Sequence, residues 1–332
     1  MTERTERHPA APDYGLAGGG PRGHAKGRHS MSTVVTRGLD RPPRTAAAAG
    51  RRRRRAPSRA GYSRPRTTGQ WIVLGACVLL LVYFAFPVYV IVSTALKGPG
   101  ATGGSLGLPK SIDMSGFRLA WGQLKGNLWN SVQIAVPATI ISCFLGALNG
   151  FVLAKTPFRG AKLLFILMMV GMFIPFQAVI IPLFIFLKTL GLQGTLVGIV
   201  TVHVIYGLPF ATLIMRNYYV TIPDGIVEAA TVDGCGLIST FFRVMLPLSV
   251  PGFVVAGIFQ FTNIWNDFLF GLIVTSQQTW PVTVRLNNLL GDTSVDYGTL
   301  MAGALMVAAP TVIVYIGLGR YFIGGLTAGS VK

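Results

Sequence analysis

Residues 222–247 read IPDGIVEAATVDGCGLISTFFRVMLP and form a polar interruption between two long apolar stretches. Charged residues lie in or just before this segment: Arg216, Asp224, Glu228, Asp233 and Arg243. Each costs about 2.5 kcal/mol or more at the centre of a bilayer on insertion scales. Residues 216–247 are therefore not a membrane span, and we expect them to form a loop on or outside the membrane.

Two short helices are predicted within this loop. Thr221 and Asp224 have the spacing of a capping box. Ile222, Ile226 and Ala230 recur on one face, so the first helix is predicted to begin near residue 222. Gly234 and Gly236 are predicted to end it in the left-handed conformation. Leu237, Phe241 and Val244 then form the apolar face of a second helix.

The first of these helices combines small side chains with charge. Ala229 and Ala230 permit close approach of another surface, and Glu228 and Asp233 offer carboxylates beside them. Such a helix fits the groove of a partner protein. The alternative is an interfacial helix that packs only against its own bundle.

The composition of the chain is that of a membrane protein. Of 332 residues, 51% are hydrophobic and 12% are charged, and the mean hydropathy is +0.56. Six stretches are long enough to cross a hydrocarbon core about 30 Å thick. They are residues 71–96, 129–154, 162–187, 195–215, 249–275 and 301–323. The fold class is therefore all-α, a polytopic bundle of six spans over residues 71–332.

An even number of spans places both termini on one side, and basic residues identify that side as the cytoplasm. The residues concerned are the N-terminal tail, Lys155, Arg159, Lys162, Arg216, Arg243 and Lys332. The segment after the first span is an exception, because Lys97, Lys110, Arg118 and Lys125 would lie outside. The N-terminal block of charge should dominate.

Residues 1–70 carry 16 of the 29 Lys and Arg but 4 of the 11 Asp and Glu, a net charge of +12. This stretch lacks apolar periodicity, and we expect a disordered basic tail in the cytoplasm. The run from Arg51 to Arg55 precedes the first span, where basic residues set topology and contact anionic lipid. We therefore expect membrane lipid, and no nucleic acid, as its partner.

Two common motifs of enzyme chemistry are absent. The sequence has no HExxH metal motif and no GxxxxGK[ST] phosphate loop, so neither a zinc hydrolase site nor a nucleotide-binding loop is predicted in this chain. The three cysteines stand singly, so neither a disulfide nor a metal site is predicted. One function that a membrane bundle could have is that of a secondary transporter. That function would require carboxylates near the membrane midplane or inverted repeats.

Polar residues inside the spans are candidates for a translocation path. Asp267 falls toward the outer end of the fifth span, beside Trp265 and Asn266. These three could line that path, or they could form a cap and an aromatic belt at the external interface. Gln177 and His203 are further candidates, although such residues more often make an interhelical hydrogen bond than bind a ligand.

The 222–247 segment resembles the EAA motif of permease subunits in binding-protein-dependent ABC importers. That motif has the spacing E-A-A, three residues, G, nine residues, I, one residue, L-P. Glu228, Ala229, Ala230, Gly234, Leu246 and Pro247 match it, and Val244 replaces its isoleucine. The resemblance runs from residue 71 to the C-terminus and is strongest to the maltose-type carbohydrate permeases. Supporting stretches are IPFQAVIIPLF (174–184), FTNIWNDFLFGLIV (261–274) and RYFIGGLTAGSVK (320–332).

This resemblance implies a type I ABC importer permease bundle with a cytoplasmic coupling helix. It implies three kinds of partner, namely a second permease subunit, a cytoplasmic ABC ATPase dimer and an extracellular sugar-binding protein. The ATPase would use the ATP, and this chain would bind no cofactor and catalyse no reaction. Residues 228–230, 233, 234, 246 and 247 would contact the ATPase, and the C-terminal GLTAGSVK would reach toward its nucleotide sites.

Overall fold

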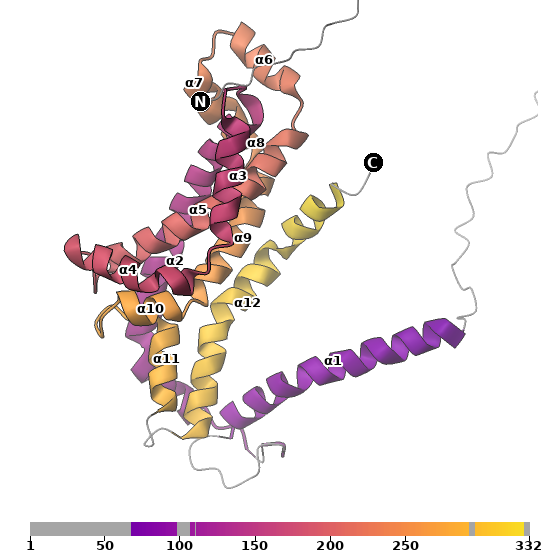
Figure 1. Cartoon of the computed structure of the whole chain (residues 1–332). Helices are drawn as coiled ribbons and strands as arrows, with labels where there is room; N and C mark the ends of the chain where they lie inside the picture. The colour runs from indigo at the N-terminus through magenta and orange to yellow at the C-terminus, as the bar shows by residue number, and fades with distance from the viewer. Residues whose placement is uncertain (1–67, 98–106, 110, 292–295, 329–332) are drawn as a thin grey trace, which may run out of the picture. The chain divides into compact units, whose positions relative to one another are not determined.

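The computed structural model describes residues 68–97, 107–109, 111–291 and 296–328, with side chains up to residue 319. These residues belong to one compact unit and form helices without strands (Figure 1). The elements are α1 (Thr68–Ala95), α2 (Ser115–Lys155), α3 (Ala161–Met172), α4 (Phe176–Thr189), α5 (Leu196–Thr221), α6 (Asp224–Val232), α7 (Leu237–Thr240), the π-helical η1 (Phe241–Met245), α8 (Leu246–Leu248), α9 (Val250–Trp265), α10 (Leu269–Val274), α11 (Val282–Leu290) and α12 (Tyr297–Ala328). The basic tail predicted at 1–70 lies almost wholly outside the described residues.

Four of these helices are long and apolar enough to cross a membrane, namely α1, α2, α5 and α12. Two bent pairs raise the number to six if each is one span. One pair is α3 with α4, bent by 96°, and the other joins residues 237–248 to α9 at 77°. The predicted all-α, polytopic class is confirmed, with four candidate spans in the described residues, or six if each bent pair is one span. Of the second pair, only α9 lies within the predicted fifth span.

The third span, predicted as one helix over 162–187, breaks at residues 173–175. Pro175 lacks an N–H and disfavours helical conformation in the residue before it. In the structure α3 ends at Met172, and Pro175 immediately precedes α4. Prolines elsewhere in the spans, Pro87, Pro137, Pro182 and Pro310, stay inside helices.

The fifth span, predicted as one helix over 249–275, also breaks. Helix α9 ends at Trp265 and α10 begins at Leu269, with Asn266 and Asp267 between them. Short polar side chains compete with the backbone for hydrogen bonds. The Asp267 carboxylate does so by accepting the N–H groups of Phe270 at 3.4 Å and Gly271 at 3.0 Å, in the first turn of α10.

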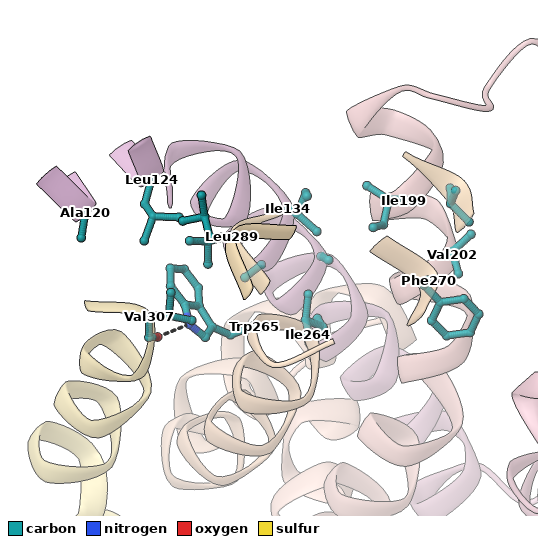
Figure 2. Close-up of a cluster of buried hydrophobic side chains, with 14 of the residues drawn as sticks. Ala120, Leu124, Ile134, Ile199, Val202, Ile264, Trp265, Phe270, Leu289 and Val307 are labelled. Atoms are coloured by element: carbon teal, nitrogen blue, oxygen red, sulfur yellow. Dashed lines mark hydrogen bonds between the residues drawn. The ribbon is translucent and has the colours of Figure 1, made fainter. Parts of the chain in front are cut away.

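Helix α2 begins at Ser115, well before the predicted residue 129. Asp113 accepts the Ser115 N–H at 2.8 Å, and this hydrogen bond lowers the pKa of the Asp113 carboxyl. Ala120 and Leu124 follow on one face and are fully buried near Gly303 of α12. Figure 2 shows Ala120 and Leu124 at the end of a core that also includes Trp265 and Val307. Tertiary packing therefore extends the helix beyond its apolar stretch.

Helices α2 and α5 pack closely because glycines line their contact. A Cβ on Gly146 would lie 2.6 Å from the Cβ of Ala211. A Cβ on Gly150, one turn later, would lie 2.7 Å from the Arg216 backbone nitrogen. Small residues spaced in this way let membrane helices approach through their backbones. This contact places the start of the 222–247 segment, which follows α5, at the end of α2.

Candidate functional site

The 222–247 segment forms a compact unit at the end of α5. Helix α6 starts at Asp224, two residues after the predicted start, and Pro223 stands at its N-cap. The predicted capping box is wrong, because α5 continues to Thr221 and the Thr221 hydroxyl donates to the Tyr218 carbonyl oxygen at 2.7 Å. The elbow between α6 and α7 is present, as predicted.

Only one of the two glycines predicted to end α6 does so. Gly234 has φ of 82°, in the left-handed region that favours glycine. Gly236 has φ of −72° and instead begins α7. The turn between the two helices therefore depends on Gly234.

The structure divides this segment into a buried face and an exposed face. Phe241 and Met245 are buried in a cluster with Phe151 of α2 and Tyr219 of α5, and Ala230 of α6 is also buried. Of the other residues of the EAA motif, Glu228, Ala229, Gly234 and Pro247 are exposed and Leu246 is half-buried. Asp233, which lies between the matched positions, is exposed as well. The motif thus contributes one anchor, Ala230, and a largely exposed surface.

Two apolar side chains on the exposed face were not predicted. Val232 at the end of α6 is 87% exposed and Ile238 of α7 is 74% exposed. Of the second apolar face predicted from the sequence, Phe241 is buried, whereas Leu237 is exposed and Val244 is half-buried. Val232 and Ile238 thus add two large apolar side chains to the exposed face of the segment.

An ion pair holds the segment to the bundle. Lys155, the last residue of α2, places Nζ 2.5 Å from Asp224 Oδ1 and also donates to the Ile222 carbonyl oxygen. The Lys155 side chain is 3% exposed and that of Asp224 is 77% exposed. The end of α2, the end of α5 and the start of α6 therefore meet at one buried ammonium group.

A second candidate site is a cavity of about 630 Å³, the α5–α9 cavity, which lies between α3, the start of α4, α5, α9 and α10. Its polar lining consists of His203, Tyr206, Gln260, Asn263 and Asp267. Its apolar lining includes Met168, Met172, Phe176, Phe210 and Phe270. The volume falls within the range of about 300–1,000 Å³ that is usual for ligand pockets.

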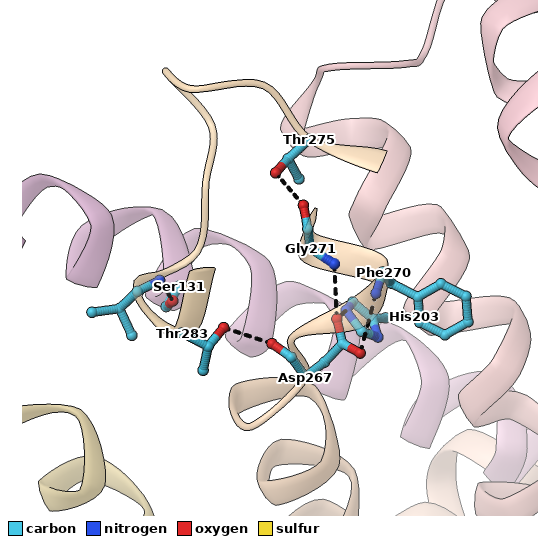
Figure 3. A network of polar contacts seen from close by, with 8 residues as sticks. Ser131, His203, Asp267, Phe270, Gly271, Thr275 and Thr283 are labelled. Carbon is cyan, nitrogen blue, oxygen red and sulfur yellow. Dashed lines mark hydrogen bonds and ion pairs between the residues drawn. The ribbon is translucent and has the colours of Figure 1, made fainter. Parts of the chain in front are cut away.

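His203 and Asp267 face each other in this cavity. Asp267 Oδ2 lies 3.8 Å from His203 Nε2, and the same carboxylate caps α10 (Figure 3). Thr283 of α11 donates to the Asp267 carbonyl oxygen at 2.6 Å. Asp267 thus combines the role of a helix cap, one of the alternatives drawn from the sequence, with a place in the cavity wall.

The other candidates for a translocation path lie elsewhere. Trp265 is 2% exposed, and its Nε1 donates to the Val307 carbonyl oxygen at 2.9 Å, as Figure 2 shows. Asn266 is exposed and donates to the Thr262 carbonyl oxygen, and Gln177 is exposed on α4. None of the three lines the cavity. The structure brings His203 and Asp267 together and leaves these three apart.

Comparison with known proteins identifies the family. Residues 142–322 match the family described as the inner membrane component of binding-protein-dependent transport systems. The chain belongs to this family. The match includes α5, the whole 222–247 segment and α9. The chain is therefore a transmembrane permease subunit of a binding-protein-dependent importer, a transport component rather than an enzyme, in the inner membrane.

Two relatives and one solved structure extend this assignment. A probable ABC transporter permease protein of Pyrococcus horikoshii is 45% identical over 185 residues, 55% of this chain and 67% of that protein. A xylose/arabinose import permease protein of Haloferax volcanii is 32% identical over 275 residues, 75% of this chain and 89% of that protein. A bacterial ABC transporter involved in alginate import has the same fold, with a TM-score of 0.68 and 22% identity over 78% of this chain and 99% of its own.

Proposed function

We propose that this permease forms half of the translocation pathway of an ATP-driven sugar importer and couples to a separate ATPase through the 222–247 segment. Family membership implies, in general, a partner permease, an ATPase and a substrate-binding protein. The observation that carries the specific proposal is the exposed face of α6 and α7, held by a buried anchor and an ion pair.

The geometry of the segment suits a mechanical link. Its exposed face offers Glu228 and Asp233 beside the apolar Val232 and Ile238, a mixture typical of a protein interface. Its buried side is fixed to α2 and α5 through Phe241 and Met245. A displacement of α6 by the ATPase is therefore transmitted to the spans rather than absorbed in a loose loop. ATP-driven closure of the ATPase dimer would then rock the bundle between inward- and outward-facing states.

Charge supports a cytoplasmic location for the segment and for both termini. Lys155, Arg159, Lys162, Arg216 and Arg243 lie at the end of the bundle where α6 is found. Short loops rich in basic residues face the cytoplasm. With six spans, the N- and C-termini lie on the same side, and the extracellular binding protein would dock at the opposite end.

Sugar as the substrate class is supported by the maltose-type resemblance of the sequence and by the name of the Haloferax volcanii relative, a xylose/arabinose import permease. In the proposed complex ATP is used by the partner ATPase, and this chain binds no cofactor. The surrounding lipid is its remaining partner.

The experiment is purification of the tagged chain from its native membrane, followed by identification of the proteins that come with it. ATP hydrolysis of the preparation is then measured with and without sugar-loaded binding protein. We expect an ATPase, a second permease and stimulated hydrolysis. Transport by the chain alone in liposomes under an ion gradient would contradict the proposal.

A pair of variants tests the docking surface itself. Val232→Asp places a carboxylate on the exposed face of α6, where 87% exposure makes misfolding an unlikely complication. Ile112→Asp is the matched control, because Ile112 is 74% exposed and lies just before α2, whose other end carries Lys155. We expect Val232→Asp to lose the co-purifying ATPase and Ile112→Asp to retain it. Equal retention in both variants would place the ATPase elsewhere.

A further inference from the structure

The α5–α9 cavity contains polar groups that the fold does not satisfy. In the part of the chain that the structure describes, the Tyr206 hydroxyl and the Asn263 side-chain amide make no hydrogen bond. Both side chains are exposed at the cavity, from the facing helices α5 and α9. Groups of this kind in a concave site of adequate size are available to a ligand.

The pair of His203 and Asp267 adds a buried polar group. His203 is 6% exposed, and its Nε2 lies 3.8 Å from Asp267 Oδ2, too long for a direct hydrogen bond. A polar contact of that length accommodates a bridging oxygen. A hydroxyl group placed between them could donate to the Asp267 carboxylate and accept an N–H hydrogen bond from the His203 imidazole. The ring nitrogen of His203 that carries the proton would then face the hydroxyl group.

Aromatic rings line the same cavity. Phe270 lies 5.0 Å from Tyr206 and 5.1 Å from Phe176, measured between ring centroids, and all three residues line the cavity. Aromatic faces pack against the apolar faces of a ring-shaped ligand, while planar polar side chains bind its edge. This combination suits a molecule that is apolar on its faces and rich in hydroxyl groups around its rim.

The charges of the residues that line the cavity restrict the class of ligand further. Among the described residues that line the cavity there is no Lys or Arg, so these residues offer an acidic sugar no cation to neutralise it. Both oxygens of Asp267 already accept N–H groups of α10, which leaves this carboxylate poorly disposed to hold a cation alone. The lining therefore fits a neutral ligand.

The cavity lies part-way along α5. His203 and Phe210 are about 10 and 21 Å along α5 from its start, at 1.5 Å per residue, and the 222–247 segment follows the other end of that helix. We propose that the α5–α9 cavity is a binding site for a neutral sugar of one or two rings, contacted by Tyr206 and Asn263. This inference rests on the proposed function and deepens it, because it places a substrate contact within this subunit.

The test uses the whole importer, purified through a tag on this chain and reconstituted in liposomes with ATP inside and binding protein outside. Uptake is measured for radiolabelled D-xylose, L-arabinose, maltose, diacetylchitobiose and, as an acidic sugar, D-galacturonate. Tyr206→Phe and Asn263→Ala each remove one polar contact. Tyr315→Phe is the matched control, since Tyr315 is 45% exposed on α12 against 37% for Tyr206 and does not line the cavity.

We expect uptake of at least one neutral sugar, lowered about three- to tenfold by Tyr206→Phe and by Asn263→Ala, the effect of losing one hydrogen bond. We also expect the ratio of uptake between two neutral sugars to change, which a merely structural effect would not cause. Tyr315→Phe should retain the wild-type rate. Stimulated ATP hydrolysis by each variant verifies that its complex is assembled.

Two results would overturn the cavity assignment while the proposed function stands. One is a double variant, Tyr206→Phe with Asn263→Ala, that keeps wild-type rates and ratios for the neutral sugars. The other is ATP-dependent uptake of D-galacturonate alone. If the wild-type complex takes up no sugar of the panel with ATP, the substrate class of the proposed function fails, and the cavity assignment fails with it.

Discussion

At Gly234 the backbone has φ of 82°, a conformation that costs other L-residues about 1–2 kcal/mol. Gly234→Val should therefore displace α7 relative to α6 and lower transport severalfold while the chain still inserts. Gly225→Ala is the control, because Gly225 lies inside α6 with open space around it. Liposome uptake and membrane insertion are measured for both variants. Normal transport by Gly234→Val would mean that the elbow has no part in coupling.

At Lys155 a buried ammonium group joins α2 to the start of α6. Lys155→Met should free α6 from α2 and lower the amount of substrate moved per ATP hydrolysed. Asp224→Asn should have a smaller effect, since Lys155 keeps its bond to the Ile222 carbonyl oxygen. Lys162→Met removes the same charge from an exposed position on α3 and should leave this ratio unchanged. Equal ratios in all three variants would show that the ion pair does not transmit motion.

At the scale of single residues, the sequence predicts part of the site. The EAA spacing identifies the exposed Glu228 and the left-handed Gly234, because both depend on the local sequence. The sequence identifies Lys155 only as a basic residue on the cytoplasmic side, and not as the partner of α6, because its partners are 67 and 69 residues away. Tyr206 and Asn263 are missed for the same reason, since only the packing of α5 against α9 brings them to one cavity.

At the scale of helices, the contact between α2 and α5 depends on the absence of side chains. Gly146→Ala would press a methyl group against the Ala211 backbone, 2.8 Å away, and overpacking of this kind costs about 1–3 kcal/mol. Gly122→Ala on the same helix has nothing within 4 Å and should be neutral or slightly stabilising. Unfolding by SDS in mixed micelles measures the difference. Equal stability of the two variants would contradict the close packing.

Helix boundaries are the feature of the fold that the sequence predicts least well. Hydropathy locates six apolar stretches, because burial in lipid depends on composition alone. It does not locate the break at Pro175, since proline is tolerated within membrane helices when neighbours satisfy the backbone. Nor does it locate the break at Asp267, because hydropathy does not show whether a carboxylate accepts backbone N–H groups. Hydropathy also predicts the start of α2 too late, at residue 129. The contacts of Ala120 and Leu124 with α12 extend the helix toward the N-terminus, to Ser115.

At the scale of the whole chain, the sidedness of the bundle can be read from its own cysteines. Cys235 lies half-exposed between α6 and α7, Cys143 is buried, and Cys77 lies within the apolar α1. A membrane-impermeant maleimide requires a thiol in water. We therefore expect it to label Cys235 in inside-out vesicles and to leave it unlabelled in right-side-out vesicles, with Cys77 and Cys143 unlabelled in both.

A second labelling site is needed on the opposite side of the membrane, and residue 112, an isoleucine in the native chain, is a suitable position. It is 74% exposed and lies before the start of α2, whereas Lys155 at the other end of the same helix pairs with Asp224. With six spans and a cytoplasmic 222–247 segment, Ile112→Cys should be labelled from the outside and Cys235 from the inside. If the maleimide labelled both cysteines from the same side, α2 could not span the bilayer. A reversal of both would invert the topology and place the 222–247 segment out of reach of a cytoplasmic ATPase.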